Sequence, residues 1–152
     1  MPDPIAFTSV SPRFRLPLLF AGQSQKEFFV NEAHALTDAL LHPAIEGEAD
    51  TPPSAPVEGE CWLVGDAPTG AWENHAGKLA SRQAGGWMFV PPRNGLRALD
   101  LATGQEIRYR DGWQRPVTPL DPTGGATVDA QARAAIVELI EILIGSGILA
   151  QS

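Results

Sequence analysis

The chain has 152 residues, of which 43% are hydrophobic and 19% are charged, a composition that excludes a disordered chain and fits a globular domain. Its net charge of −7 argues against nucleic acid and anionic membrane surfaces as direct partners. No stretch approaches the roughly 20 uninterrupted apolar residues of a membrane span, and the N-terminus lacks the pattern of a signal peptide.

The first 16 residues are predicted to form an extended arm. Pro2, Pro4 and Pro12 disfavour a helix there, and the arm has too few bulky residues for a core of its own. Such an arm is either disordered or ordered against a partner. Residues 17–115 are then expected to form one globular α+β domain.

A first helix is predicted over residues 25–41. Ser24 and Glu27 have the spacing of a capping box, in which both side chains satisfy backbone donors at the start of a helix, and His42-Pro43 ends it. Apolar residues at spacings of four, three and four predict the face that packs on the core. These residues are Phe29, Ala33, Leu36 and Leu40.

The middle of the chain is predicted to be a small central antiparallel β-sheet or partial barrel. Residues 44–60 are rich in proline and acidic residues, which is typical of a surface loop. Residues 61–64 and 87–90 are predicted strands, and two further strands flank Thr103-Gly104 as a hairpin. The single cysteine, Cys61, excludes an internal disulfide, fits a reducing compartment and is expected to be buried.

Residues 116–126 are predicted to be a linker, and residues 127–152 to contain a C-terminal helix capped by Thr127 or Asp129. Apolar residues on this helix have the spacing of a coiled-coil seam with a widened flank. We expect them to form the interface of a homo-oligomer, a trimer or a pentamer, although the helix could instead dock on its own sheet. The residues are Ala132, Ile136, Leu139, Ile140, Leu143 and Ile144.

The polar residues show no clear catalytic or metal-binding motif. His34 and Asp38 are one helical turn apart, a spacing more typical of a helix surface than of catalysis. No histidine, cysteine or acidic cluster has metal-ligand spacing, and no serine has the context of a nucleophile elbow. We therefore expect no enzyme, no cofactor and no metal; an envelope-degrading enzyme would need carboxylates that converge in a cleft.

Three tryptophans follow glycine-rich turns, namely Trp72, Trp87 and Trp113. Tryptophan stacks on sugar rings, so these residues could bind glycan if they are exposed. A small sheet also needs bulky residues in its core, and the sequence favours that interpretation. The alternative function is a carbohydrate-binding receptor module that recognises host surface polysaccharide.

The segment from Arg15 to Glu27 (RLPLLFAGQSQKE), followed by Asn31-Glu32-Ala33 and residues 36–40, resembles a specific family. It is similar to uncharacterised domains of alphaproteobacterial phages, prophages and gene transfer agents, found in tail-fibre and head-spike proteins. The resemblance covers about residues 13–145, and His34 departs from the family pattern, in which leucine more often follows Asn-Glu-Ala.

The resemblance implies a structural virion protein that assembles in the bacterial cytoplasm with other capsid or fibre proteins. No catalytic residue of the family can be carried over to this chain. Because fibre proteins continue into shafts and this chain stops soon after its last helix, we expect the base or adaptor of a head spike or tail fibre. The arm and first helix would attach it to the particle, and the last helix would cluster its copies.

Overall fold

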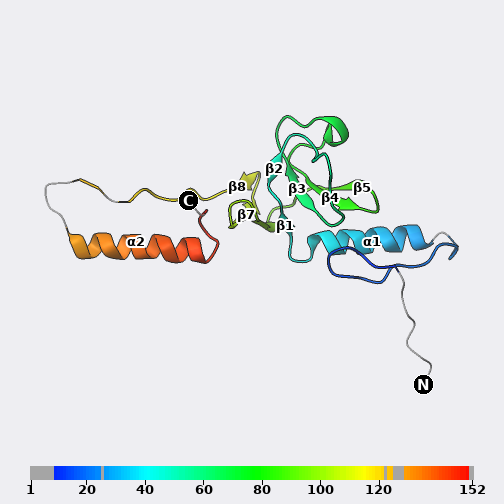
Figure 1. Ribbon diagram of the computed structural model, residues 1–152, viewed down its shortest axis with the longest axis horizontal. Helices are drawn as coiled ribbons and strands as arrows, with labels where there is room; N and C mark the ends of the chain where they lie inside the picture. The colour runs from blue at the N-terminus through cyan, green and yellow to red at the C-terminus, as the bar shows by residue number, and fades with distance from the viewer. Residues whose placement is uncertain (1–8, 25, 122, 125–128, 151–152) are drawn as a thin grey trace, which may run out of the picture. The chain divides into compact units, whose positions relative to one another are not determined.

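The computed structural model describes residues 9–24, 26–121, 123–124 and 129–150. These residues form two compact units, each with its own sheet, and most elements of both are labelled in Figure 1. The N-terminal unit draws on Met1–Pro43 and Glu48–Pro92, and the C-terminal unit on Ala44–Gly47 and Arg93–Ser152. The domain boundaries expected from the sequence stay predictions.

The N-terminal unit contains one helix and a four-stranded mixed sheet with the strand order β2-β3-β4-β5. β2 runs parallel to β3, and the other neighbours are antiparallel. A two-residue turn, Ala84-Gly85, joins β4 to β5 with positive φ at both residues, as a type I′ turn requires. The elements are α1 (Lys26–Leu40), β2 (Glu48–Ala49), β3 (Cys61–Val64), the 3₁₀-helix η1 (Gly70–Trp72), β4 (Leu79–Gln83) and β5 (Gly86–Val90).

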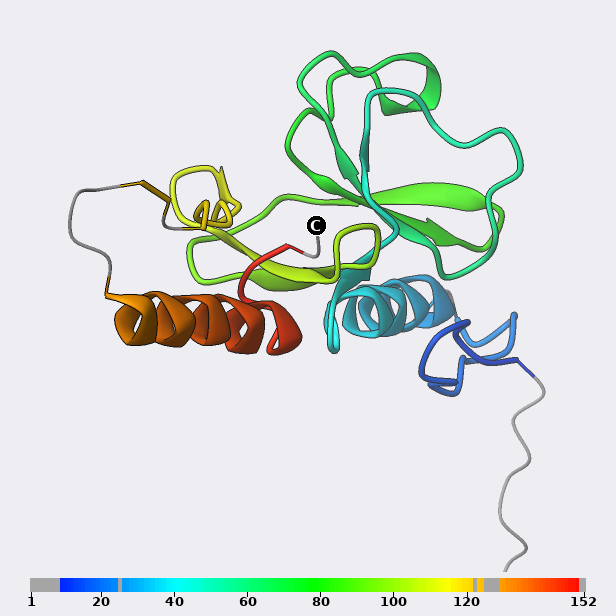
Figure 2. The same ribbon diagram turned by 60° about the vertical axis from the view of Figure 1, so that its left-hand side comes forward.

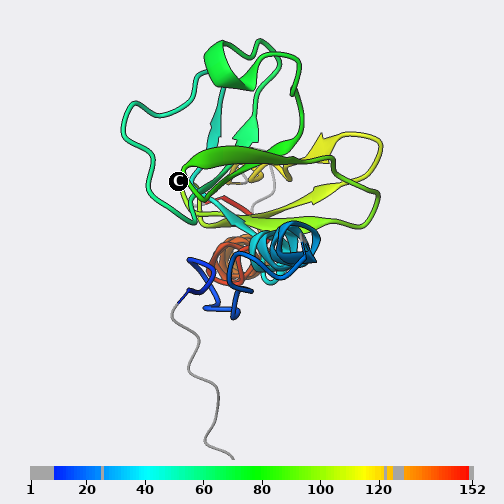
Figure 3. The ribbon, with the colours of Figure 1, turned by 90° about the vertical axis from the view of Figure 1, so that its right-hand side faces the viewer.

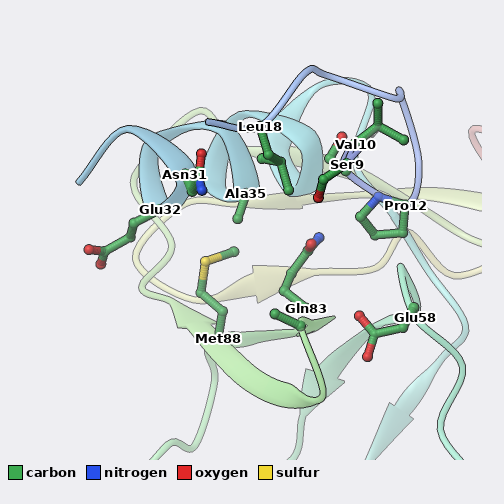
Figure 4. Close-up of a pocket in the computed structure, with 12 residues that line it drawn as sticks. Ser9, Val10, Pro12, Leu18, Asn31, Glu32, Ala35, Glu58, Gln83 and Met88 are labelled. Carbon is green, nitrogen blue, oxygen red and sulfur yellow. The ribbon is translucent and has the colours of Figure 1, made fainter. Parts of the chain in front are cut away.

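Tryptophans fill the core on one face of this sheet. Trp72, carried by η1, is completely buried with Val64 and Ala80. Its ring meets that of Trp87 edge-on at 5.1 Å between centroids and that of Trp62 at 6.4 Å. α1 lies over the opposite face of the sheet (Figure 4). Cys61 is buried, as predicted.

The C-terminal unit contains a second four-stranded mixed sheet, with the order β1-β6-β7-β8 and β1 parallel to β6. Its buried apolar residues include Ile45, Ile107, Ile140 and Leu149. Of the two predicted caps, Asp129 caps the helix by accepting a hydrogen bond from Ala132 N, and Thr127 lies outside the described residues. The elements are β1 (Ala44–Ile45), β6 (Arg97–Asp100), β7 (Gln105–Tyr109), β8 (Trp113–Gln114) and α2 (Ala130–Gly145).

After α2 the chain turns back onto its own sheet (Figure 2). Gly147 makes the turn with a φ of 73°, and a Cβ there would lie 3.3 Å from the carbonyl oxygen of Gly104. Its own carbonyl accepts a hydrogen bond of 2.6 Å from Glu106 N on β7. The buried Gln105 amide donates to Ile148 O and to Pro116 O, so Gln105 joins the segment after α2 to the chain that follows β8.

The predicted α+β fold with a helix at each end is confirmed, as are the strands over 61–64 and 87–90 and the hairpin at Thr103-Gly104. The structure differs by having two mixed sheets, neither of them closed, where one antiparallel sheet was expected. The predicted loop over 44–60 contains β1 and β2. Each is only two residues long and pairs with a strand distant in sequence, so no local pattern could reveal it.

Candidate functional site

The N-terminal segment, residues 9–24, lies along α1 (Figure 3), and a stripe of polar side chains on that helix binds its backbone. Its spacing is four, three and four residues, so the side chains share one helix face. The residues of this polar stripe are Glu27, Asn31, His34 and Asp38.

Each of the first three residues binds one stretch of the segment. Glu27 Oε1 accepts from Gly22 N at 3.1 Å. The Asn31 amide pairs with both backbone groups of Leu19, at 2.8 and 3.1 Å. His34 Nδ1 lies 2.8 Å from Pro17 O and donates to it, since a carbonyl oxygen only accepts. The segment therefore runs antiparallel to α1.

Asp38 holds the far end of the segment and is completely buried. Its carboxylate accepts hydrogen bonds from Ser11 Oγ at 2.5 Å, Phe14 N at 2.6 Å and Arg13 N at 3.1 Å. Burial by itself would raise the pKa of the Asp38 carboxyl, but the hydrogen bonds donated to it outweigh burial and lower this pKa below its ordinary value. We call this arrangement the Asp38 clamp.

Arg13 caps the C-terminal end of α1 with its guanidinium group. It donates to the carbonyl oxygens of Asp38, Ala39 and His42 at 2.8–2.9 Å. The last carbonyls of a helix have no partner within it and carry partial negative charge, so a cation placed there is stabilising. The N-terminal segment and the helix are thus joined by both hydrogen bonding and charge.

The sequence did not reveal this role. The spacing of His34 and Asp38 predicts a pair on the helix surface, whereas both residues hold the N-terminal segment. Ser24 has a φ of 59°, not the extended backbone of an N-cap, and Glu27 reaches back to Gly22, so the predicted capping box is wrong. The four residues of the polar stripe do share a helical register, but this spacing alone does not distinguish bound from solvated side chains.

The predicted core face of α1 is also wrong. Phe29 is 77% exposed, Ala33 and Leu40 are exposed, and Leu36 is half-buried. The residue buried on the sheet side is Ala39, which lies one position earlier in the helical register. Within the N-terminal unit, the apolar stripe at positions 29, 33, 36 and 40 therefore faces outward.

Between the N-terminal segment, α1 and the β4–β5 hairpin lies a groove of about 590 Å³ (Figure 4). Its walls are mostly apolar and include Leu18, Ala35 and Met88, while Glu32 and Glu58 carry the acidic groups of its lining. The full lining is Ser9, Val10, Ser11, Pro12, Leu18, Asn31, Glu32, Ala35, Glu58, Gln83, Ala84 and Met88.

The predicted oligomer interface divides between two faces of α2. Ile140 is buried within its own unit, and Leu143 and Ile144 are half-buried. Ala132, Ile136 and Leu139 are exposed, as is Ile142. The flank of the expected seam thus packs inward, and most of the seam itself faces outward; self-association stays a prediction.

The three tryptophans of the possible glycan platform differ in exposure. Trp72 is completely buried, which fits core packing and leaves no ring face for a sugar, and Trp87 packs against it. Trp113 is half-buried and meets Tyr109 edge-on at 5.5 Å. Tyr109 also lines a cavity of about 370 Å³ with Arg97, Arg108 and Arg110.

Other polar groups offer little chemistry. Among the described residues, no three histidine, cysteine or acidic side chains lie close enough together to hold a metal ion. His75 stacks on Phe89 at 3.5 Å, and burial, with the charge of nearby Lys78, lowers the pKa of its imidazole. Neither helix of the described residues is long and apolar enough to cross a bilayer.

The chain belongs to the family described as a protein of unknown function (DUF2793), whose model matches residues 30–114. The match contains every strand of both sheets and three residues of the polar stripe, Asn31, His34 and Asp38. No curated protein matches the chain.

Proposed function

We propose that this protein is a structural component of a phage-like particle or gene transfer agent, where it acts as the base or adaptor of a head spike or tail fibre. In this proposal α2 clusters several copies, and the N-terminal unit attaches the cluster to other proteins of the particle. The resemblance of residues 13–145 to domains of tail-fibre and head-spike proteins supports the setting, and the exposed helix faces support the assembly role.

The observation that carries the proposal is the outward face of α2. Ile136, Leu139 and Ile142 are 44%, 58% and 57% exposed within the C-terminal unit, although each is a large aliphatic residue. Their spacing of three residues places them along one side of the helix. Contiguous exposed apolar surface of this kind marks a protein interface, and burying each side chain would contribute about 2 kcal/mol.

The oligomeric mass tests this proposal directly. We expect light scattering coupled to size exclusion to give a trimer or a pentamer for the full chain. Leu139→Glu places a charge in the interface and should give a monomer, while Gln131→Glu, the same new charge at an exposed polar position of α2, should keep the assembly. A wild-type monomer at micromolar concentration would contradict the proposal.

The particle setting needs a separate test. An antibody against the full chain, coupled to gold and applied to purified particles, should label the vertices of the head or the tip of the tail. Labelling absent from particles whose other proteins are detected would exclude a virion role, whatever the oligomeric mass.

A second candidate function is a carbohydrate-binding receptor module, favoured by Trp113 and Tyr109 beside the arginine-lined cavity. An aromatic ring binds a sugar face, and arginine binds sugar carboxylates. Glycan-array binding that Trp113→Ala removes, with the fold retained, would favour this function. Binding to no glycan on the array would exclude it.

A further inference from the structure

The N-terminal unit has an unprotected sheet edge. β5 pairs with β4 alone, and the register of this hairpin directs the N–H and C=O groups of Trp87 and Phe89 away from β4. Within the described residues these groups have no main-chain partner. β5 has the sequence Gly-Trp-Met-Phe-Val, with no charge, proline or bulge to protect it, so the edge can accept another strand.

The groove adjoins this edge on the side of the sheet that faces α1. Met88 lies between Trp87 and Phe89 and lines the groove (Figure 4). A strand added at β5 would lie about 4.8 Å from it, with the side chain opposite Met88 on the same face of the sheet. That side chain would enter the groove beside Leu18 and Ala35.

α1 leaves room for such a strand. Residues 28, 32, 35 and 39 share one helix face, which is buried at Ala39, half-buried at Ala35 and exposed at Glu32 and Phe28. The space beside this face therefore widens toward the start of the helix. Phe28, which is 71% exposed, offers a ring surface at the wide end.

The charges of the groove lining indicate which kind of segment the groove would bind. Glu32 and Glu58 are acidic, and no lysine or arginine lines the groove. Glu58 already accepts from Gly85 N and lies 3.6 Å from Arg82, whereas Glu32 has no salt bridge within the part of the chain described. A basic side chain beside Glu32 would complement it.

We propose that the β5 edge and the adjoining groove bind an extended segment of a partner protein by strand addition, with an apolar side chain opposite Met88 and a basic side chain beside Glu32. Backbone pairing with Trp87 and Phe89 supplies the affinity, and the groove and Glu32 supply the specificity. The inference goes beyond the proposed function, because such a segment would bind whether or not the protein belongs to a particle.

The test uses the full chain as bait for a yeast-displayed library of short random peptides. We expect the selected peptides to alternate apolar and polar residues and to contain lysine or arginine. Ala35→Phe fills the groove and should weaken their binding about tenfold or more, whereas Ala33→Phe, on the exposed neighbouring face of α1, should not. Binding should also slow hydrogen exchange at the amides of Trp87 and Phe89.

A charge reversal guards against a groove variant that fails to fold. Glu32 is exposed, so Glu32→Lys should fold normally and still weaken the selected peptides about tenfold. Glu73→Lys, the same change at an exposed position outside the groove, should leave binding unchanged. The proposal is overturned if no peptide is selected, if Glu32→Lys binds as wild type does, or if the two amides exchange equally fast with peptide bound.

Discussion

On both helices the buried apolar residue is a neighbour of the predicted apolar stripe, one position before it on α1 and one position after it on α2. On α1 the predicted core stripe contains Leu40, yet the buried apolar residue is Ala39, one position earlier. On α2 the predicted seam contains Leu139, yet the buried residue is Ile140, one position later. In both units the strongest apolar stripe faces outward. A helical period shows that a stripe exists, but not whether the same unit covers it.

The helices differ in what holds them. α1 is fixed by polar contacts: the Asp38 clamp, the Arg13 cap and the amide of Asn31. α2 is fixed by Ile140 and by the segment after it, where Gly147 accepts from β7. These polar contacts join α1 to the N-terminal segment, and the exposed apolar stripe of α1 takes no part in them.

The largest expected effect follows from removing the Asp38 clamp. Asp38→Ala leaves the Ser11 hydroxyl and the backbone N–H groups of Arg13 and Phe14 without their acceptor, and should cost about 4 kcal/mol of unfolding free energy. Urea unfolding followed by the fluorescence of Trp72 and its neighbours measures this. A loss below about 1 kcal/mol would mean that the hydrogen bonds of the clamp contribute little to stability.

The same clamp should be sensitive to acid. A carboxyl whose pKa is lowered by folding stabilises the folded state above its unfolded pKa of about 3.9, and this stabilisation is lost as the pH falls through the folded pKa. The stability difference between wild type and Asp38→Asn should thus be constant near neutral pH and shrink below about pH 4. A difference that does not change with pH would show that the charge of Asp38 is unimportant.

The next effect separates the two sides of α2. Ile140→Ala removes a buried side chain and should cost the C-terminal unit about 2 kcal/mol. Leu139→Ala, the same kind of truncation on the exposed side, should change the stability of the monomeric unit by less than about 0.5 kcal/mol. Hydrogen exchange at the β7 amides, measured in dilute monomer, compares them. Equal losses would show that both sides are packed within one unit.

A smaller effect is expected at the end of α1. Arg13→Ala should lower the unfolding free energy by about 1.5 kcal/mol, since three carbonyl groups lose a charged donor. The positive charge of this donor also interacts favourably with the negative end of the helix dipole. Arg15→Ala is the matched control, because Arg15 is exposed and two positions away. If the two variants unfolded at the same urea concentration, the Arg13 cap would contribute nothing to stability.

The sequence predicted the elements whose cause is local. Thr103-Gly104 indicates a hairpin, and Asp129, one of the two predicted caps, starts α2. It did not predict β1 and β2, whose partners β6 and β3 lie far along the chain, nor the groove, which small Ala35 and distant Met88 line together. The polar stripe was missed because polar residues on a helix are ordinarily solvated, so their common spacing carried no signal of a bound backbone.

The smallest effect is the sharpest test of the comparison. Phe29→Ser removes a large aromatic side chain that would ordinarily stabilise a helix packed on a sheet by about 3 kcal/mol or more. Because Phe29 is 77% exposed, we expect a change below about 0.5 kcal/mol in the unfolding free energy of the N-terminal unit. A loss above about 1 kcal/mol would place Phe29 in a core. A change near zero, together with lost binding to other particle proteins, would instead assign this stripe of α1 to attachment.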